Sequence, residues 1–153
     1  MIKKQLQRLL SCLALCAILA GGLTVPAAAA GFTDVPANQY YAEAVAWAAA
    51  NDIVTGTSAT TFSPNKDITR EQLTAILYRY AQYKGCDLSV GEDTNILSYG
   101  DAETVSTYAI PAMQWAVGAG IINGIKDNLV PKGNATRAQM ATMLMRFDAV
   151  TAQ

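Results

Sequence analysis

The sequence predicts an all-α protein in which two helix-loop-helix repeats pack into a small helical bundle with short irregular connecting loops. Two observations lead to this prediction. The residues around Trp47 recur around Trp115, 68 positions later, with spacings that differ by at most one residue. Each copy also holds two segments with the apolar spacing of an amphipathic helix, separated by glycine and proline.

The first 30 residues have the three parts of a secretory signal peptide. Three basic residues stand among the first eight, an apolar run follows, and four alanines end the segment. Because glycine and proline interrupt the run, it falls short of the roughly 20 apolar residues that a membrane span needs. A retained anchor and a lipoprotein are the alternatives. We expect a secreted protein that has no membrane partner after cleavage.

Charge narrows the classes of partner. Removal of the first 30 residues leaves 123, enough for one compact unit. The basic residues fall from 11 to 8 against 12 acidic ones, a net charge of about −4. Such a protein has no general field that attracts nucleic acid, which is therefore not an expected partner. Recognition of an anion must come from locally placed arginines and backbone amides.

Residue types that support catalysis are scarce. The chain has no histidine, and Cys86 is the one cysteine after residue 30, so neither a zinc site nor an intrachain disulfide is expected. Glu92 and Asp93 are paired carboxylates, but they lie in a polar connector. No serine or cysteine has a histidine to activate it. We expect no enzyme activity, no cofactor and no metal.

The first helix of each repeat is expected over residues 40–51 and 108–119, where alanine and aromatic residues dominate. In the second copy Pro111 stands near the helix start, where a missing amide hydrogen costs least. The loops that follow contain Gly56 and Gly124, which we expect at positive φ because glycine adopts it without strain.

The second helix of each repeat is expected to start at a capping box, in Thr69-Arg70-Glu71-Gln72 and Thr136-Arg137-Ala138-Gln139. Arg70 and Arg137 therefore begin these helices. Apolar residues follow at i, i+3, i+4 and i+7, which predicts that they are core: Leu73, Ile76, Leu77 and Tyr80, and Met140, Met143, Leu144 and Phe147. A methionine-lined ligand pocket is the alternative for the second set.

These residues resemble the S-layer homology repeat, which starts with aromatic-x-Asp-Val and has Thr-Arg-Ala-Glu at its second helix. Here the pattern is Phe32-Thr33-Asp34-Val35 to Ile68-Thr69-Arg70-Glu71-Gln72, and Tyr99-Gly100-Asp101 to Ala135-Thr136-Arg137-Ala138-Gln139. The expected division is a signal peptide over 1–30, repeat 1 over 31–84, a linker over 85–98 and repeat 2 over 99–153.

The resemblance implies a non-catalytic module that binds an anionic, pyruvylated type of secondary cell-wall polysaccharide. It also implies attachment to the bacterial cell wall or cell surface. Implied polymer contacts are Arg70, Arg137, Asp34, Asp101, Gly56 and Gly124. Aromatic rings can cover the apolar face of a sugar, and the candidates for this role are Tyr40 and Tyr108, or Trp47 and Trp115.

Each candidate also has a purely structural explanation. The two arginines could pair with surface carboxylates, the two tryptophans could pack in the core, and the two aspartates could cap the turn before the first helix. Members of the family commonly carry three repeats, whereas this chain has two. The alternative function is therefore an envelope interaction or assembly module that self-associates to complete a three-repeat unit.

Overall fold

The computed structural model describes residues 31–152, and this part of the chain contains helices and no strand. The predicted all-α fold is confirmed, while the predicted signal peptide lies outside the described residues. The elements in order are α2 (Ala42–Ala50), α3 (Arg70–Tyr83), η2 (Ser89–Gly91), η3 (Ala102–Thr104), η4 (Thr107–Ala109), α4 (Ile110–Gly118) and α5 (Arg137–Thr151).

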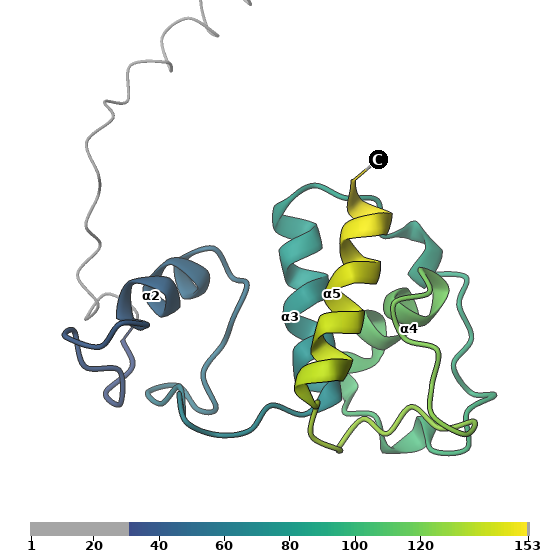
Figure 1. The fold of residues 1–153 in the computed structure, drawn as a ribbon, viewed down its shortest axis with the longest axis horizontal. Coiled ribbons are helices and arrows are strands. Elements are labelled where there is room, and N and C mark those ends of the chain that lie inside the picture. The colour runs from purple at the N-terminus through teal and green to yellow at the C-terminus, as the bar shows by residue number, and fades with distance from the viewer. Residues whose placement is uncertain (1–30, 153) are drawn as a thin grey trace, which may run out of the picture.

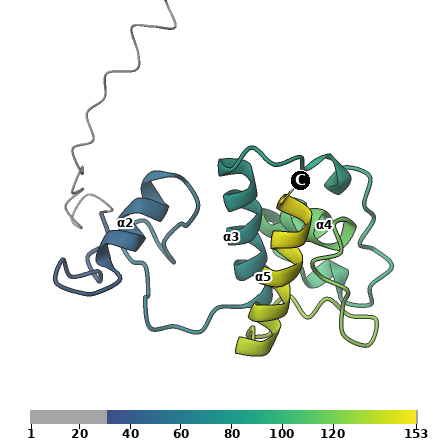
Figure 2. The same cartoon turned by 45° about the horizontal axis from the view of Figure 1, so that its top comes forward.

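The helices fall into two groups (Figure 1). Helices α3, α4 and α5 pack together and form the bundle, whereas α2 and the loops around it lie to one side, as the turned view in Figure 2 also shows. We call residues 32–66 the N-terminal unit. Helix α3 comes from the first repeat and packs against α4 of the second. The two repeats therefore share one bundle.

The first helices are shorter than predicted but end alike. Helix α4 has Pro111 in its first turn, as predicted, and η4 precedes it. After α2 the chain turns at Asp52 with φ of 57°, and after α4 it turns at Gly120 with φ of 71°. Both turns therefore use the left-handed conformation that commonly ends a helix.

Both predicted capping boxes are present. The Gln72 amide donates to Thr69 Oγ1 at 3.3 Å, and the Thr69 amide donates to Gln72 Oε1 at 2.9 Å. Thr136 and Gln139 make the same two bonds at 3.2 and 3.1 Å. Because each box satisfies two amides that helix geometry leaves free, the first residues of α3 and α5 are fixed by local sequence.

The main core lies between α3, α4 and α5 around Trp115, Met113 and Leu129, all 2% exposed or less. A second, smaller cluster holds the N-terminal unit together: Val35, Ala42 and Val45, with Phe32, Tyr41 and Phe62 packed against them. Small separate clusters are expected where a long loop packs on its own helix.

The predicted core stripes are only partly correct. Leu73, Leu77, Met143 and Phe147 are buried, but Met140 and Leu144 of α5 are 40% and 45% exposed. The prediction was wrong there because α3 is covered by α4, whereas no described element covers the same side of α5. Ile76 and Tyr80 are partly buried.

The two loop glycines differ from each other. Gly124 has φ of 75°, as predicted, but Gly56 does not adopt a positive φ. Gly56 is needed for space instead, because a Cβ there would meet the Thr61 carbonyl and lie 2.5 Å from the Phe32 ring.

Residues 31–152 carry neither a membrane-spanning helix nor a metal-binding cluster, and they contain one free thiol. No helix there is long and apolar enough to span a bilayer. No group of histidine, cysteine, aspartate and glutamate side chains is placed to hold a metal ion in this part of the chain. Cys86 is a free thiol.

Candidate functional site

The two repeats are joined at the start of α3. The Arg70 amide donates to Gly133 O at 2.8 Å, and Arg70 Nε donates to Leu129 O at 2.9 Å. Arg70 is 5% exposed. Burial lowers the pKa of its guanidinium, and the charge of Asp101 opposes that effect. The predicted anion contact is thus a buried residue that ties repeat 1 to repeat 2.

Glu71, the next residue, forms a polar cluster with repeat 2. Its carboxylate accepts from the Ser106 amide at 3.0 Å, the Ser106 hydroxyl at 2.9 Å, Lys132 Nζ at 2.8 Å and the Tyr108 hydroxyl at 3.4 Å. Burial raises the pKa of Glu71, but the bonds from Lys132 and Ser106 and the Lys132 charge outweigh it, so the pKa is lowered. The carboxylate therefore stays ionised, and Lys132 is its ion-pair partner.

The two predicted aspartates hold loops. Asp34 accepts from the amides of Phe62 and Ser63 at 2.8 and 2.7 Å, and Asp101 accepts from the amides of Leu129 and Val130, both at 2.7 Å. The bond from Phe62 is the main cause of a lowered pKa at Asp34; burial opposes it and the bond from Ser63 adds to it. Each aspartate therefore fixes the loop before the second helix of its own repeat.

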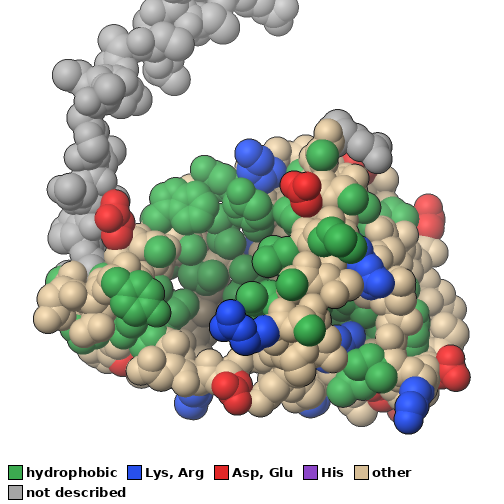
Figure 3. Space-filling view, viewed as in Figure 1, with side chains coloured by type: hydrophobic (Ala, Val, Ile, Leu, Met, Phe, Trp, Pro, Cys, Tyr) green, Lys and Arg blue, Asp and Glu red, His purple; other side chains and the backbone are tan. Residues whose placement is uncertain are grey.

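A large cavity of about 640 Å³ lies between the loops of the N-terminal unit and one side of α3. Figure 3 shows the surface hollowed here, with basic side chains at the edge of the hollow. Its lining includes hydroxyls, an amide, aromatic rings and two cations: Thr55, Thr57, Ser63, Gln72, Phe62, Tyr108, Lys66 and Arg79. The predicted Gly56 lines it as well.

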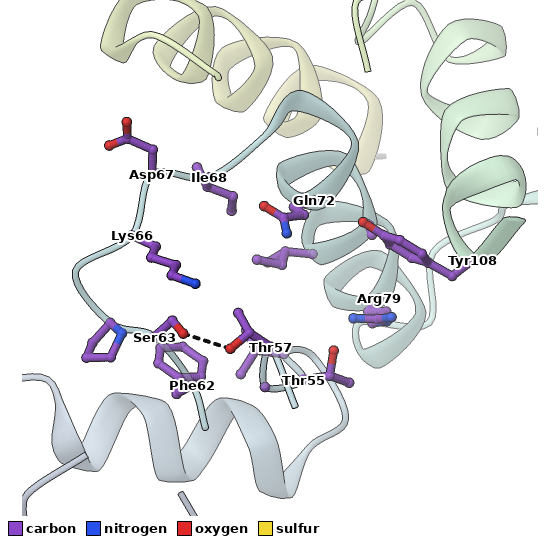
Figure 4. Close-up of a pocket in the computed structure, with 15 residues that line it drawn as sticks. Thr55, Thr57, Phe62, Ser63, Lys66, Asp67, Ile68, Gln72, Arg79 and Tyr108 are labelled. Carbon is purple, nitrogen blue, oxygen red and sulfur yellow. Dashed lines mark hydrogen bonds between the residues drawn. The ribbon is translucent and has the colours of Figure 1, made fainter. Parts of the chain in front are cut away.

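Positive charge prevails in the large cavity. Lys66 and Arg79 have no ion-pair partner among residues 31–152, where Lys132 and Glu71 form the pair that is present. Asp67 also lines the cavity, but its carboxylate points away from the space and accepts a bond from Asn134 at 2.9 Å (Figure 4). Lys66 and Gln72 extend into the cavity from opposite walls.

Tyr108 forms the far wall of this cavity and comes from repeat 2. Its ring is half exposed, and its hydroxyl is directed to Glu71. Burial and the Glu71 charge raise the pKa of the Tyr108 phenol. The ring is thus held by the inter-repeat cluster while its face stays available to a ligand.

A small cavity of about 230 Å³ occupies the equivalent place in repeat 2. Arg70 and the predicted Gly124 line it together with Arg146, which stands at the position of Arg79. Arg146 Nη1 donates to Ile121 O at 3.2 Å, so helix and loop are drawn together there. Arg79 makes no such bond within the described residues, and the equivalent space in repeat 1 is wider.

The remaining predicted residues are scattered. Tyr40 is 96% exposed, and Trp47 is 47% exposed with its ring edge-on to Tyr83 at 5.7 Å. Trp115 is a core residue that packs against Tyr78 and Phe147. Arg137 is exposed at the start of α5. The structure therefore gathers Gly56 with Tyr108 in one cavity and Arg70 with Gly124 in the other.

Sequence reasoning missed the two free cations of the large cavity. Arg79 carried a usable signal, because Arg146 follows it by 67 residues, the spacing that also relates Arg70 to Arg137. Lys66 carried none, since Gly133 occupies its position in repeat 2.

Comparison with known proteins matches the S-layer homology domain at residues 31–74 and 98–141. The surface-layer 125 kDa protein of Lysinibacillus sphaericus is 34% identical over 119 residues, 75% of this chain and 10% of that protein. An amylopullulanase of Thermoanaerobacterium thermosulfurigenes is 35% identical over 118 residues, 74% of this chain and 6% of the enzyme.

An S-layer protein of Bacillus thuringiensis subsp. finitimus is 27% identical over 131 residues, 84% of this chain and 15% of that protein. The chain thus spans 6 to 15% of the length of these three relatives. No solved structure matches the chain.

Proposed function

The chain belongs to the S-layer homology domain family, whose domains anchor proteins to cell surfaces, and we propose that it binds an anionic secondary polysaccharide of the bacterial cell wall without catalysis. The large cavity carries this proposal. It combines hydroxyls and aromatic rings with two cations that have no acidic partner within residues 31–152, and this combination suits a sugar that bears a carboxylate.

The cations have complementary roles. Arg79 projects from α3 and is only partly exposed, so its planar guanidinium offers two parallel donors to a carboxylate held at the wall of the cavity. Lys66 stands on an exposed loop and extends into the space (Figure 4), where its ammonium can follow a mobile polymer. Two charge-assisted contacts of this kind are stronger than neutral hydrogen bonds.

The neutral lining suits the rest of a sugar. Thr57 and Ser63 are hydrogen-bonded to each other at 2.7 Å, so the segment between α2 and α3 holds two hydroxyls side by side in the cavity lining. Tyr108 and Phe62 supply ring surfaces for the apolar face of a pyranose. The site therefore pairs charge recognition with stacking.

The small cavity offers a second, weaker contact. Arg70 and Arg146 both line it, beside the backbone of Gly124. Two sites on one chain reinforce each other along a repeating polymer, because the second binding event is intramolecular. Exposed Arg137 adds a positive charge at the start of α5.

A non-catalytic role fits the chemistry of the large cavity. Glycoside cleavage commonly needs two carboxyl groups that face one bond. Asp67 is the acidic residue in this lining, and its carboxylate is turned away and bonded to Asn134. The proposed location is the cell wall or cell surface of a secreting bacterium.

Co-sedimentation with purified cell-wall sacculi tests the proposal. The exported protein should pellet with intact sacculi and remain in solution with sacculi stripped of secondary polymer. The double variant Lys66→Gln, Arg79→Gln should lose binding. Its matched control, Lys84→Gln with Lys126→Asn, removes two positive charges outside the cavity and should bind normally. If the wild type pelleted equally well with intact and with stripped sacculi, polymer binding would be refuted. If the cavity variant bound intact sacculi normally, the large cavity would be refuted as the site.

A further inference from the structure

The contact between α3 and α4 shows how one repeat covers the next. The Tyr108 hydroxyl reaches Glu71 of α3, and the Trp115 ring packs edge-on against Tyr78 of α3 at 5.6 Å. Ala112 lies on the same face of α4, four residues after Tyr108 and three before Trp115, and is 2% exposed. The second helix of repeat 1 thus covers the first helix of repeat 2.

The same face of α5 is uncovered. Thr74, Leu77 and Tyr78 of α3 correspond to Ala141, Leu144 and Met145 of α5, 67 residues later. Thr74 and Leu77 are 0% and 5% exposed, whereas Leu144 and Met145 are 45% and 66% exposed. Hydrophobic side chains are visible over α5 on the face seen in Figure 3. Helix α5 therefore presents to solvent the surface that its counterpart buries.

The matching face of α2 is uncovered as well. Ala44 and Trp47 hold the positions of Ala112 and Trp115, and Tyr40 holds that of Tyr108. Tyr40 is 96% and Trp47 47% exposed, and Ala44 is also exposed. The backbone of α2 lies close to no other helix of the described chain, and its contact with α3 is the Trp47 ring edge-on to Tyr83. The chain thus carries both halves of the α3–α4 contact a second time, and Ala44, Leu144 and Met145 on these surfaces stay exposed within the described residues.

The loop that receives Arg70 is also duplicated. Leu129 supplies the carbonyl that accepts from Arg70 Nε, and Phe62 is its counterpart in repeat 1. Asp101 and Asp34 hold these loops by identical pairs of amide bonds. The next residue, Val130 or Ser63, has φ of 52° or 62°. The receiving loop of repeat 1 is therefore built in the conformation that binds an arginine in repeat 2.

The two exposed surfaces lack the ion pair of the observed contact, and they lack both of its members. In the observed contact Glu71 meets Lys132. The corresponding residues are Ala138 on α5 and Asn65 on the receiving loop, so both charges are absent together. A contact between these surfaces would therefore leave neither member of this ion pair buried without the other, which is a usual penalty of such an interface.

We propose that a second copy of this chain occupies these surfaces, with α5 of one copy packed on α2 of the other and Arg137 inserted into the 62–66 loop. The amides of Arg137 and Ala138 make no hydrogen bond to residues 31–152, and the carbonyls of that loop would accept them. The contact is head-to-tail, so different surfaces of the two copies meet.

The same contact completes the large cavity. In the small cavity Arg70 of the preceding repeat lies beside Arg146. In the docked pair, Arg137 of one copy takes the equivalent place beside Arg79 of the other. The association of the two copies does not depend on the proposed polymer. Only the binding of polymer in the completed cavity rests on the proposed function.

Sedimentation velocity without polymer tests the association, with protein recovered from the culture medium of an expressing bacterium. Leu144→Glu blocks the α5 surface and Ala44→Glu blocks the α2 surface. Wild type should associate as its concentration rises, each variant alone should stay monomeric, and an equimolar mixture of the two should form a one-to-one dimer. Ala149→Glu, at the position of exposed Gln82, is the matched control and should associate like wild type.

Two results would overturn the proposal. One is a wild type that remains monomeric up to about 1 mM, beyond the range of useful affinity. The other is self-association of Ala44→Glu alone, which would mean that two α5 surfaces meet each other. Circular dichroism confirms that the variants are folded, and Met145→Glu, at a more exposed position, replaces Leu144→Glu if that variant unfolds.

Discussion

Arg70 and Leu129 are joined by a 2.9 Å hydrogen bond from Nε to the carbonyl oxygen, although 59 residues separate them in sequence. The bond lies in the interior and connects the first turn of α3 to the loop before α5. It fixes the start of a helix in one repeat against a loop of the other.

Replacement of Arg70 by alanine should therefore destabilise the protein. We expect the free energy of unfolding to fall by about 2–3 kcal/mol, because the buried Leu129 carbonyl loses its donor. Urea denaturation of dilute protein measures this loss. Arg137→Ala removes the exposed counterpart and should cost less than about 0.5 kcal/mol. Equal losses in the two variants would contradict the structural role of Arg70.

Glu71→Gln should weaken the protein in a pH-dependent way. The pKa of Glu71 is lowered in the folded protein, so its contribution is complete above the unfolded pKa of about 4.3 and is lost as pH falls through the folded value. We expect a loss of about 1–3 kcal/mol at pH 7 that shrinks below about pH 4. Denaturation at a series of pH values would show the difference in free energy of unfolding between wild type and variant becoming smaller as pH falls. A constant difference down to pH 2 would argue against an ionised Glu71.

Gly56→Ala should loosen the N-terminal unit. The new Cβ would press against the Thr61 carbonyl and the Phe32 ring, and backbone cannot move aside cheaply. Because the bundle has its own core, we expect faster amide hydrogen exchange over residues 32–66 and little change in α3, α4 and α5. Gly85→Ala is the comparison, since its φ is positive but a Cβ there meets nothing within 4 Å. Uniformly faster exchange along the chain would show that the two groups unfold together.

The two tryptophans should respond differently to truncation. Trp115→Ala should cost about 3–5 kcal/mol, because it leaves a large cavity in the main core. Trp47→Ala should cost about 1 kcal/mol, since nearly half of that side chain is already exposed. Thermal unfolding in the monomeric range provides the comparison, and similar losses would place Trp47 in a core.

Sequence reasoning succeeded where structure is decided locally. Thr69 and Gln72 are three residues apart, and the capping box needs nothing else to form. The amino-acid pattern that recurs around Trp47 and Trp115 also predicted two copies of the same helix-loop-helix unit. Local rules do not say, however, what covers a helix from outside.

That limit explains the errors. Leu77 and Leu144 hold equivalent positions, yet one is buried and the other is exposed, because α4 packs against α3 and no element of the described residues covers that side of α5. Arg70 and Arg137 differ for the same reason. The large cavity was not predictable either, since it depends on the distance between the N-terminal unit and α3 rather than on any motif.

The Arg70 amide and side chain donate hydrogen bonds to the next repeat. These bonds also affect where in the gene such repeats can be duplicated or recombined. The segment that recurs in the sequence starts near residue 31, but the segment that folds together starts near residue 67 and runs through α5. A gene duplication or insertion placed between α3 and α4 would split a core, whereas one placed near residues 64–67 would fall between two packed groups. Tolerated recombination points are therefore expected in the middle of a repeat and not at its ends.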